Sequence, residues 1–104
     1  MYGRLVELEG IDPSRREEAL HNIRENVIPA FKEMDGFAGF ISLVDVDNRR
    51  ARSVVLWDTR ENAEEGERQI KPRRDEMTQK MGITVRSADL YEAPIVEVTA
   101  GVHA

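Results

Sequence analysis

Two short apolar segments joined by a polar loop constrain the fold of this chain more than any other feature. They cover residues 37–46 and 51–59 and are rich in the β-branched and aromatic residues that favour strands. Asp47 and Asn48, in the loop between them, suit a tight turn. The sequence therefore predicts a β-hairpin near the centre of the chain.

A helix is predicted on the N-terminal side of this hairpin. Asp12 is placed to cap it, and Pro13 to occupy its first position, where a missing N–H costs nothing. Apolar residues then recur at helical spacing between positions 20 and 34. Pro29 lies inside this stripe, so we expect the helix to kink there or its first part to end just before it.

A second helix is predicted after the hairpin. It begins at Asp58 or Thr59, and Gly82 ends it. Its apolar stripe is thin and consists of Ala63, Ile70, Met77 and Met81. Gly66 and Pro72 interrupt the stripe, and a break at Pro72 would open a pocket entrance. An edge helix that is largely solvated explains the same pattern.

Residues 2–9 and 84–92 have the composition and alternation of two further strands. The order of elements is then β-α-β-β-α-β. This order predicts an α+β, ferredoxin-like fold, in which a four-stranded antiparallel sheet carries both helices on one face. The 104 residues are expected to form a single domain, with 93–104 as a C-terminal tail.

The hairpin strands are apolar on both faces, although the predicted helices cover only one. In residues 37–46, Phe40 and Val44 point to one side, and Ile41 and Leu43 to the other. Residues 51–59 show the same pattern, with Val54 and Leu56 opposed to Val55 and Trp57. A face that met water would alternate to polar residues. We therefore expect a homodimer in which the sheets of two copies pack together.

Charge and composition argue against several kinds of partner and site. The net charge is −5, so the chain lacks the basic field that nucleic-acid binding requires. There is no cysteine, which removes disulfides, thiolate catalysis and cysteine-based metal sites. The charged N-terminus does not resemble a signal peptide, and no apolar stretch approaches the roughly 20 residues that span a bilayer. We expect a cytoplasmic protein with no nucleic-acid or membrane partner.

Two local motifs resemble those of a known family. One is GFAGF at residues 36–40, which enters the second strand, and the other is VVLWDTRENAEE at residues 54–65. Together with the order of elements, they resemble the dimeric α/β-barrel superfamily, and most closely its antibiotic-biosynthesis-monooxygenase-like domains. The resemblance implies homodimers with face-to-face sheets and a pocket between the sheet and the helices of each subunit. It also implies activities that range from cofactor-free oxidation of aromatic polyketides or quinols by O₂ to heme degradation.

The heme-degrading branch can be tested residue by residue. The resemblance implies a heme-ligating histidine on the second helix, nine or ten residues after the strand tryptophan. Gly66 and Glu67 occupy those positions, and no histidine occurs between His21 and His103. The sequence therefore argues against heme degradation.

Five residues are candidates for lining a ligand pocket, namely Trp57, Phe40, Met77, Arg4 and His21. Trp57 is either an aromatic wall for a flat ligand or a core residue between sheet and helix. Arg4 either points into a polar pocket or reaches solvent at the strand end. His21 is either a proton carrier or an exposed surface residue.

Other kinds of site find little support. The basic cluster KPRR at residues 71–74 either holds an anion or pairs with nearby acids. The two histidines lie far apart, so no metal site is expected, and motifs for flavin, nicotinamide and pterin are missing. Two functions therefore stay open. One is a cofactor-independent monooxygenase-like protein acting on a small aromatic or polycyclic substrate. The other is a non-catalytic homodimeric module that binds a small hydrophobic ligand or a partner protein.

Overall fold

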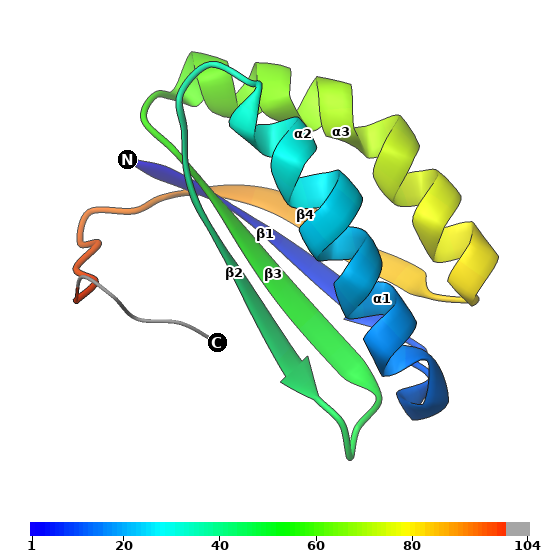
Figure 1. Ribbon diagram of the computed structural model, residues 1–104. Helices are drawn as coiled ribbons and strands as arrows, with labels where there is room; N and C mark the ends of the chain where they lie inside the picture. Colours follow the sequence, from blue (N-terminus) through cyan, green and yellow to red (C-terminus); the bar gives the residue numbers. More distant parts are fainter. Residues whose placement is uncertain (100–104) are drawn as a thin grey trace.

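A computed structural model describes residues 1–99 of the chain. It contains one antiparallel sheet of four strands in the order β2-β3-β1-β4. The strands are β1 (Tyr2–Glu9), β2 (Phe37–Asp45), β3 (Arg50–Trp57) and β4 (Thr84–Glu92). The helices cover one face of this sheet (Figure 1). The predicted α+β, ferredoxin-like arrangement is confirmed, with β1 in a central position between β3 and β4.

The helical segment between β1 and β2 is irregular in its middle. Asp12 caps the short turn η1 (Pro13–Arg15) by accepting a hydrogen bond from the Ser14 amide at 2.9 Å. There follow α1 (Arg16–Asn22), the π-helical turn η2 (Ile23–Val27) and α2 (Ile28–Lys32). Pro29 has no N–H to donate to the preceding turn, and the regular α pattern is lost immediately before it. The predicted irregularity therefore takes the form of a π turn.

The second helix, α3 (Arg60–Met81), is a continuous rod. Thr59 is its N-cap, because the Thr59 hydroxyl accepts the Asn62 amide at 3.1 Å. Gly82 ends it in the left-handed conformation, with φ of 68°. The predicted break at Pro72 is wrong, since the helix runs through this residue. A proline near the middle of a long, well-anchored helix removes one hydrogen bond without ending it. No helix in the part of the chain described by the structure is long and apolar enough to cross a bilayer.

The core is built around Trp57, which is only 1% exposed. Its ring meets those of Phe31 and Phe37 edge to face, with centroids 5.9 Å apart in both pairs. Its six-membered ring also lies directly under Gly66 of α3, where a Cβ atom would overlap it. Gly66 thus interrupts the apolar stripe because it lets the helix approach the tryptophan closely.

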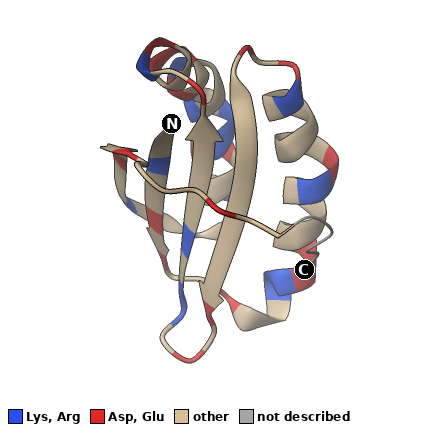
Figure 2. Cartoon of the chain, turned by 90° about the vertical axis from the view of Figure 1, so that its left-hand side faces the viewer, with Lys and Arg blue, Asp and Glu red and all other residues tan. Residues whose placement is uncertain are grey.

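The other face of the sheet is not covered by any helix of residues 1–99 (Figure 1). Its apolar side chains are Leu5, Ile41, Leu43, Val54, Leu56 and Tyr91, and we call this set the open face. Ile41 and Leu43 are 43% and 54% exposed. Strand β2 carries a single charged residue, Asp45, at its end (Figure 2). The expected tail, residues 93–104, leaves β4 and continues beyond the described residues.

We predict that Gly66→Ala destabilises the fold, although alanine is the better helix former by about 1 kcal/mol. The added methyl group must displace Trp57 or lift α3, and overpacking of this kind costs about 1–3 kcal/mol. Urea unfolding measures the change. In a double-mutant cycle, Trp57→Phe should relieve much of the loss caused by Gly66→Ala. A Gly66→Ala variant as stable as the parent would contradict the close contact.

Candidate functional site

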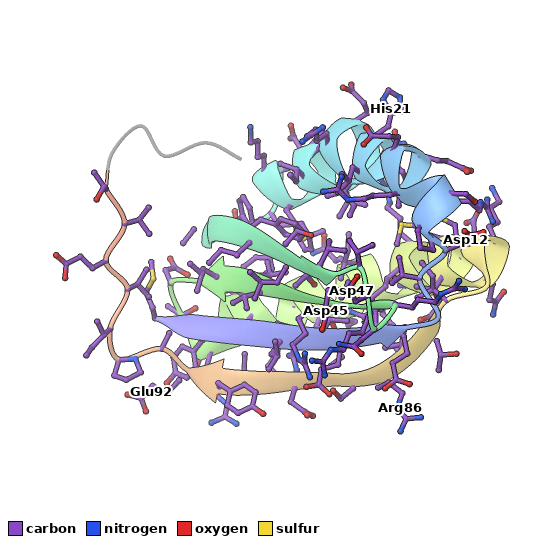
Figure 3. All side chains as sticks on the ribbon, turned by 90° about the horizontal axis from the view of Figure 1, so that it is seen from below. Asp12, His21, Asp45, Asp47, Arg86 and Glu92 are labelled. Carbon is purple, nitrogen blue, oxygen red and sulfur yellow. The ribbon has the colours of Figure 1, made fainter. Side chains whose placement is uncertain are left out.

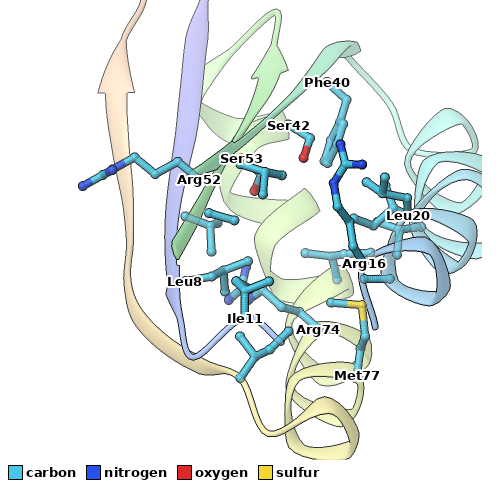
Figure 4. Close-up of a pocket in the computed structure, with 18 of the residues that line it drawn as sticks. Leu8, Ile11, Arg16, Leu20, Phe40, Ser42, Arg52, Ser53, Arg74 and Met77 are labelled. Atoms are coloured by element: carbon cyan, nitrogen blue, oxygen red, sulfur yellow. The ribbon is translucent and has the colours of Figure 1, made fainter. Parts of the chain in front are cut away.

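A cavity of about 110 Å³ lies between the sheet and the helices. Figure 4 shows a close-up of its lining, which comes from strands β1, β2 and β3, from the helical segments between β1 and β2, and from α3. Most of its wall is apolar, including the rings of Phe31 and Phe40 and the side chains of Leu20 and Ile70. The rings of Phe31 and Phe40 are tilted by 34° with centroids 6.1 Å apart.

Small residues on the strands create this space. Ser42 of β2 pairs with Ser53 of β3, and Ser53 pairs with Val6 of β1 on its other side. One register step further along, Val44 faces Ala51. Alternate residues of a strand point to the same side, so these positions all face the helices. Two serines and an alanine fill less of the space between sheet and helices here than the large residues do around Trp57. The cavity is the space that they leave.

The five candidate residues from the sequence divide into two groups. Phe40 and Met77 line the cavity. Trp57, Arg4 and His21 lie outside its lining. Trp57 fills the core under Gly66, and Arg4 is held beneath α3 by acidic residues. His21 lies on the exposed outer side of α1, away from the sheet (Figure 3).

Arg4 belongs to a buried ion-pair network that we call the Arg4–Glu67–Arg74 network. The Arg74 guanidinium donates two hydrogen bonds to the Glu67 carboxylate, at 2.8 and 2.7 Å. Arg4 Nε lies 3.9 Å from the same carboxylate, and Arg4 Nη1 donates to the Ala88 carbonyl at 3.1 Å. The side chains of Arg4, Glu67 and Arg74 are 10%, 17% and 10% exposed. The bidentate hydrogen bonds that Arg74 donates to Glu67 raise the pKa of Arg74, so its guanidinium stays charged.

The network explains most of the basic cluster at residues 71–74. Arg74 pairs with Glu67, Lys71 with Asp75 at 2.8 Å, and Arg73 donates to the Asn26 carbonyl at 3.1 Å. The cluster therefore serves mainly to bind its own chain, which was one of the two predicted roles. It also supplies the cavity with Arg74, which the sequence offered only as one member of this cluster.

The polar groups of the cavity are few. Ser42 and Ser53 present hydroxyl groups, and Arg16 and Arg74 are cationic. Arg52 also contributes to the wall, but its charged end points away (Figure 4) and pairs with Glu7 on the other face at 3.1 Å. This pairing lowers the pKa of Glu7. No carboxylate or imidazole lines the cavity, and residues 1–99 hold no cluster of three acidic or histidine side chains suited to a metal.

Sequence reasoning missed Ser42 and Ser53, and it considered Arg74 and Glu67 only through the basic cluster, which either holds an anion or pairs with nearby acids. The serines were detectable in principle, because they are small polar residues at the helix-facing positions of otherwise apolar strands. The pairing of Glu67 with Arg74 spans seven residues, two turns of α3, and so lies on one helix face. This ion pair differs from a surface pair because it is buried, and its burial follows from the packing of α3 on the sheet, which the sequence does not show.

Solved structures with the same fold include several oxygenase-related proteins. No protein-family model matches the chain, and no curated protein matches its sequence. A monooxygenase from the gene ActVA-Orf6 of Streptomyces coelicolor, in complex with nanaomycin D, aligns with a TM-score of 0.65 and 11% identity, covering 95% of this chain and 92% of that one. A Deinococcus radiodurans protein assigned as an antibiotic biosynthesis monooxygenase aligns at 0.69 and 14% identity, covering 97% and 100%.

A dimeric ferredoxin-like protein from an uncultured marine organism also aligns, with a TM-score of 0.69 and 11% identity over 95% of this chain and 100% of that one. At these identities the similarity establishes the fold. The resemblance to the antibiotic-biosynthesis-monooxygenase-like domains is thereby confirmed at the level of architecture.

We predict that Glu67→Gln destabilises the protein by about 3 kcal/mol, because it removes the countercharge from two buried guanidinium groups. Glu64→Gln is the matched control. Glu64 is also near Arg4, at 3.6 Å, but it is 58% exposed, so its loss should cost less than about 1 kcal/mol. Denaturant unfolding of both variants tests this difference, and equal effects would contradict a special role for the buried carboxylate.

Proposed function

We propose that the cavity binds a small aromatic substrate and that the chain acts on it as a cofactor-independent monooxygenase-like protein. The observation that carries the proposal is the apolar cavity between sheet and helices, with Phe31 and Phe40 in its wall. The two rings contact each other, and a third aromatic ring can pack beside them in the cavity. The shared fold of proteins described as monooxygenases supports the same reading.

The size of the cavity favours a single ring. An apolar cavity of about 150 Å³ in another protein accommodates benzene. The cavity of this chain is smaller, at about 110 Å³, so one substituted ring is near its limit. Arg16 lies in the wall and is also exposed, which leaves room for a substituent to extend toward solvent there. A polycyclic substrate would require the helices to move.

A quinol fits the chemistry, because it supplies the electrons that O₂ needs. Hydroquinone and O₂ can give hydroxybenzoquinone and water, so one oxygen atom enters the ring and the other leaves as water. The substrate provides every electron in this balance. The protein then has to hold the ring, exclude bulk water and stabilise the ionised form of the quinol. The apolar wall and the Arg16 guanidinium supply these functions.

A second candidate is a binding module without catalysis. The observation that favours it is the absence of any carboxylate or imidazole from the cavity lining within the described residues. Such a site has no side chain that ordinarily takes a proton near neutral pH. An oxygenase would then depend on a quinol that ionises in water before it binds.

We predict that the protein accelerates O₂ uptake by single-ring quinols and that Ser53→Leu reduces this uptake at least tenfold. Leucine at position 53 fills the cavity from the sheet side. Gln69→Leu, which adds an apolar group on the exposed side of α3, should leave the rate unchanged. An oxygen electrode gives the rates, and circular dichroism shows whether each variant is folded. Ring binding without O₂ uptake would favour the binding module.

We also propose that the open face packs against the open face of a second copy. Ile41, Val54 and Leu5 form an apolar row across three strands. The next row holds Leu43, Arg52 and Glu7, whose charges already neutralise each other at 3.1 Å. A two-fold axis would bring such self-neutral rows together without like charges in opposition. The existence of a dimeric protein with this fold supports the proposal.

We predict a solution mass of twice the 11.9 kDa of one chain at micromolar concentration. Ile41→Asp and Leu43→Asp each place a charge on the open face and should shift the protein to monomer, because burying unpaired carboxylates is costly. Ser14→Asp, in the exposed turn before α1, is the control and should stay dimeric. Light scattering distinguishes the masses, and a monomeric parent protein would exclude this interface.

A further inference from the structure

The Arg4–Glu67–Arg74 network carries one more buried positive charge than negative charge. Arg4 and Arg74 contribute two guanidinium groups, and Glu67 is the single carboxylate buried with them. Glu64 approaches Arg4 at 3.6 Å, but more than half of its side chain is in solvent, which screens its charge. A low-dielectric site with an uncompensated cation favours a negatively charged partner.

The hydrogen bonds of the network are also incomplete. Arg4 Nε, Arg4 Nη2 and Arg74 Nε are buried and have no hydrogen-bond partner among residues 1–99. Buried donors without partners are rare in folded proteins and call for an explanation. Of the two arginines, only Arg74 lines the cavity. Figure 4 shows Arg74 extending from α3 toward Leu8 and Ile11 in the cavity wall.

The charged residues of the cavity all have the same sign. They are Arg16, Arg52 and Arg74. Arg52 is neutralised by Glu7 on the opposite face, and Arg16 lies at the exposed end of the cavity. Arg74 is therefore the one arginine of the lining that is both buried and directed among the apolar side chains.

We propose that Arg74 selects an aromatic anion, a phenolate or ring carboxylate, whose oxygen accepts a hydrogen bond from its guanidinium. Glu67 accepts two hydrogen bonds from the guanidinium, at 2.8 and 2.7 Å, and its carboxylate offsets part of the positive charge of Arg74. The inference rests on the proposed function, since it assigns the chemical class of the ligand to the same cavity. It adds that the buried Arg74, and not only the exposed Arg16, binds the negatively charged oxygen.

The test compares two probes of nearly equal shape, 4-nitrophenolate and 4-nitrotoluene, which differ by an anionic oxygen in place of a methyl group. Isothermal titration measures their affinities for the protein at a pH where the phenol is ionised. We expect the phenolate to bind at least tenfold more tightly than 4-nitrotoluene, the range of a charge-assisted hydrogen bond. Arg74→Met should remove this preference and retain binding of 4-nitrotoluene. Arg73→Met, one residue away on the exposed side of α3, should keep it.

Glu67→Gln should change the preference for the phenolate in the direction opposite to Arg74→Met. It removes the negative charge beside Arg74 and should increase the preference for the phenolate severalfold, whereas a purely structural role would weaken both probes alike. The ratio of two affinities is independent of how much protein is folded, so a loss of stability does not obscure the result. Equal affinities for both probes in the parent protein, unaltered by Arg74→Met, would overturn this inference and leave the proposed function intact. Failure of the parent protein to bind 4-nitrotoluene would instead contradict the aromatic cavity itself.

Discussion

The contact between Trp57 and Gly66 sets the height of α3 above the sheet, and the rest of the helix-covered face depends on that height. The indole fills the whole space under the helix near its N-terminal end and packs on Phe31 and Phe37. Away from Trp57, β3 carries Ser53 and Ala51 instead of large residues, and these line the cavity together with Ile70 and Met77 of α3. A straight helix held up by a tryptophan at one end cannot collapse onto small residues at the other. The cavity is the consequence.

The fold was predictable because it depends on patterns that are local in sequence. Strand alternation, the Asp12 and Thr59 caps and the left-handed Gly82 each leave a signature within a few residues. Pro72 was misread because propensity treats proline as a helix breaker, while the packing of Ala63, Gly66, Ile70 and Thr78 stabilises α3 on both sides of it. Tertiary packing outweighed a local preference there.

The candidate site was less predictable than the fold. It is a cavity left by small side chains between elements that are distant in the chain. Trp57 attracted attention as the single tryptophan, yet its size and its place beside Gly66 make it core. Phe40 was a candidate pocket residue and lies in the cavity wall, but the space beside it comes from serines that carry no signal of their own in the sequence. Arg74 belongs to a basic cluster whose other members are solvated, and only the register of α3 on the sheet separates it from them.

Stability alone does not explain the Arg4–Glu67–Arg74 network in this small core. A chain of this length buries a modest core, and two enclosed arginines with one carboxylate reduce what that core can contribute to stability. Hydrophobic residues of similar volume would stabilise the interior at least as well. The arrangement is easier to understand as a site that keeps a cation ready beside an apolar cavity. Glu67 then has two effects. Its carboxylate lowers the free-energy cost of burying Arg74, and it leaves the Nε of that guanidinium without a partner among the described residues.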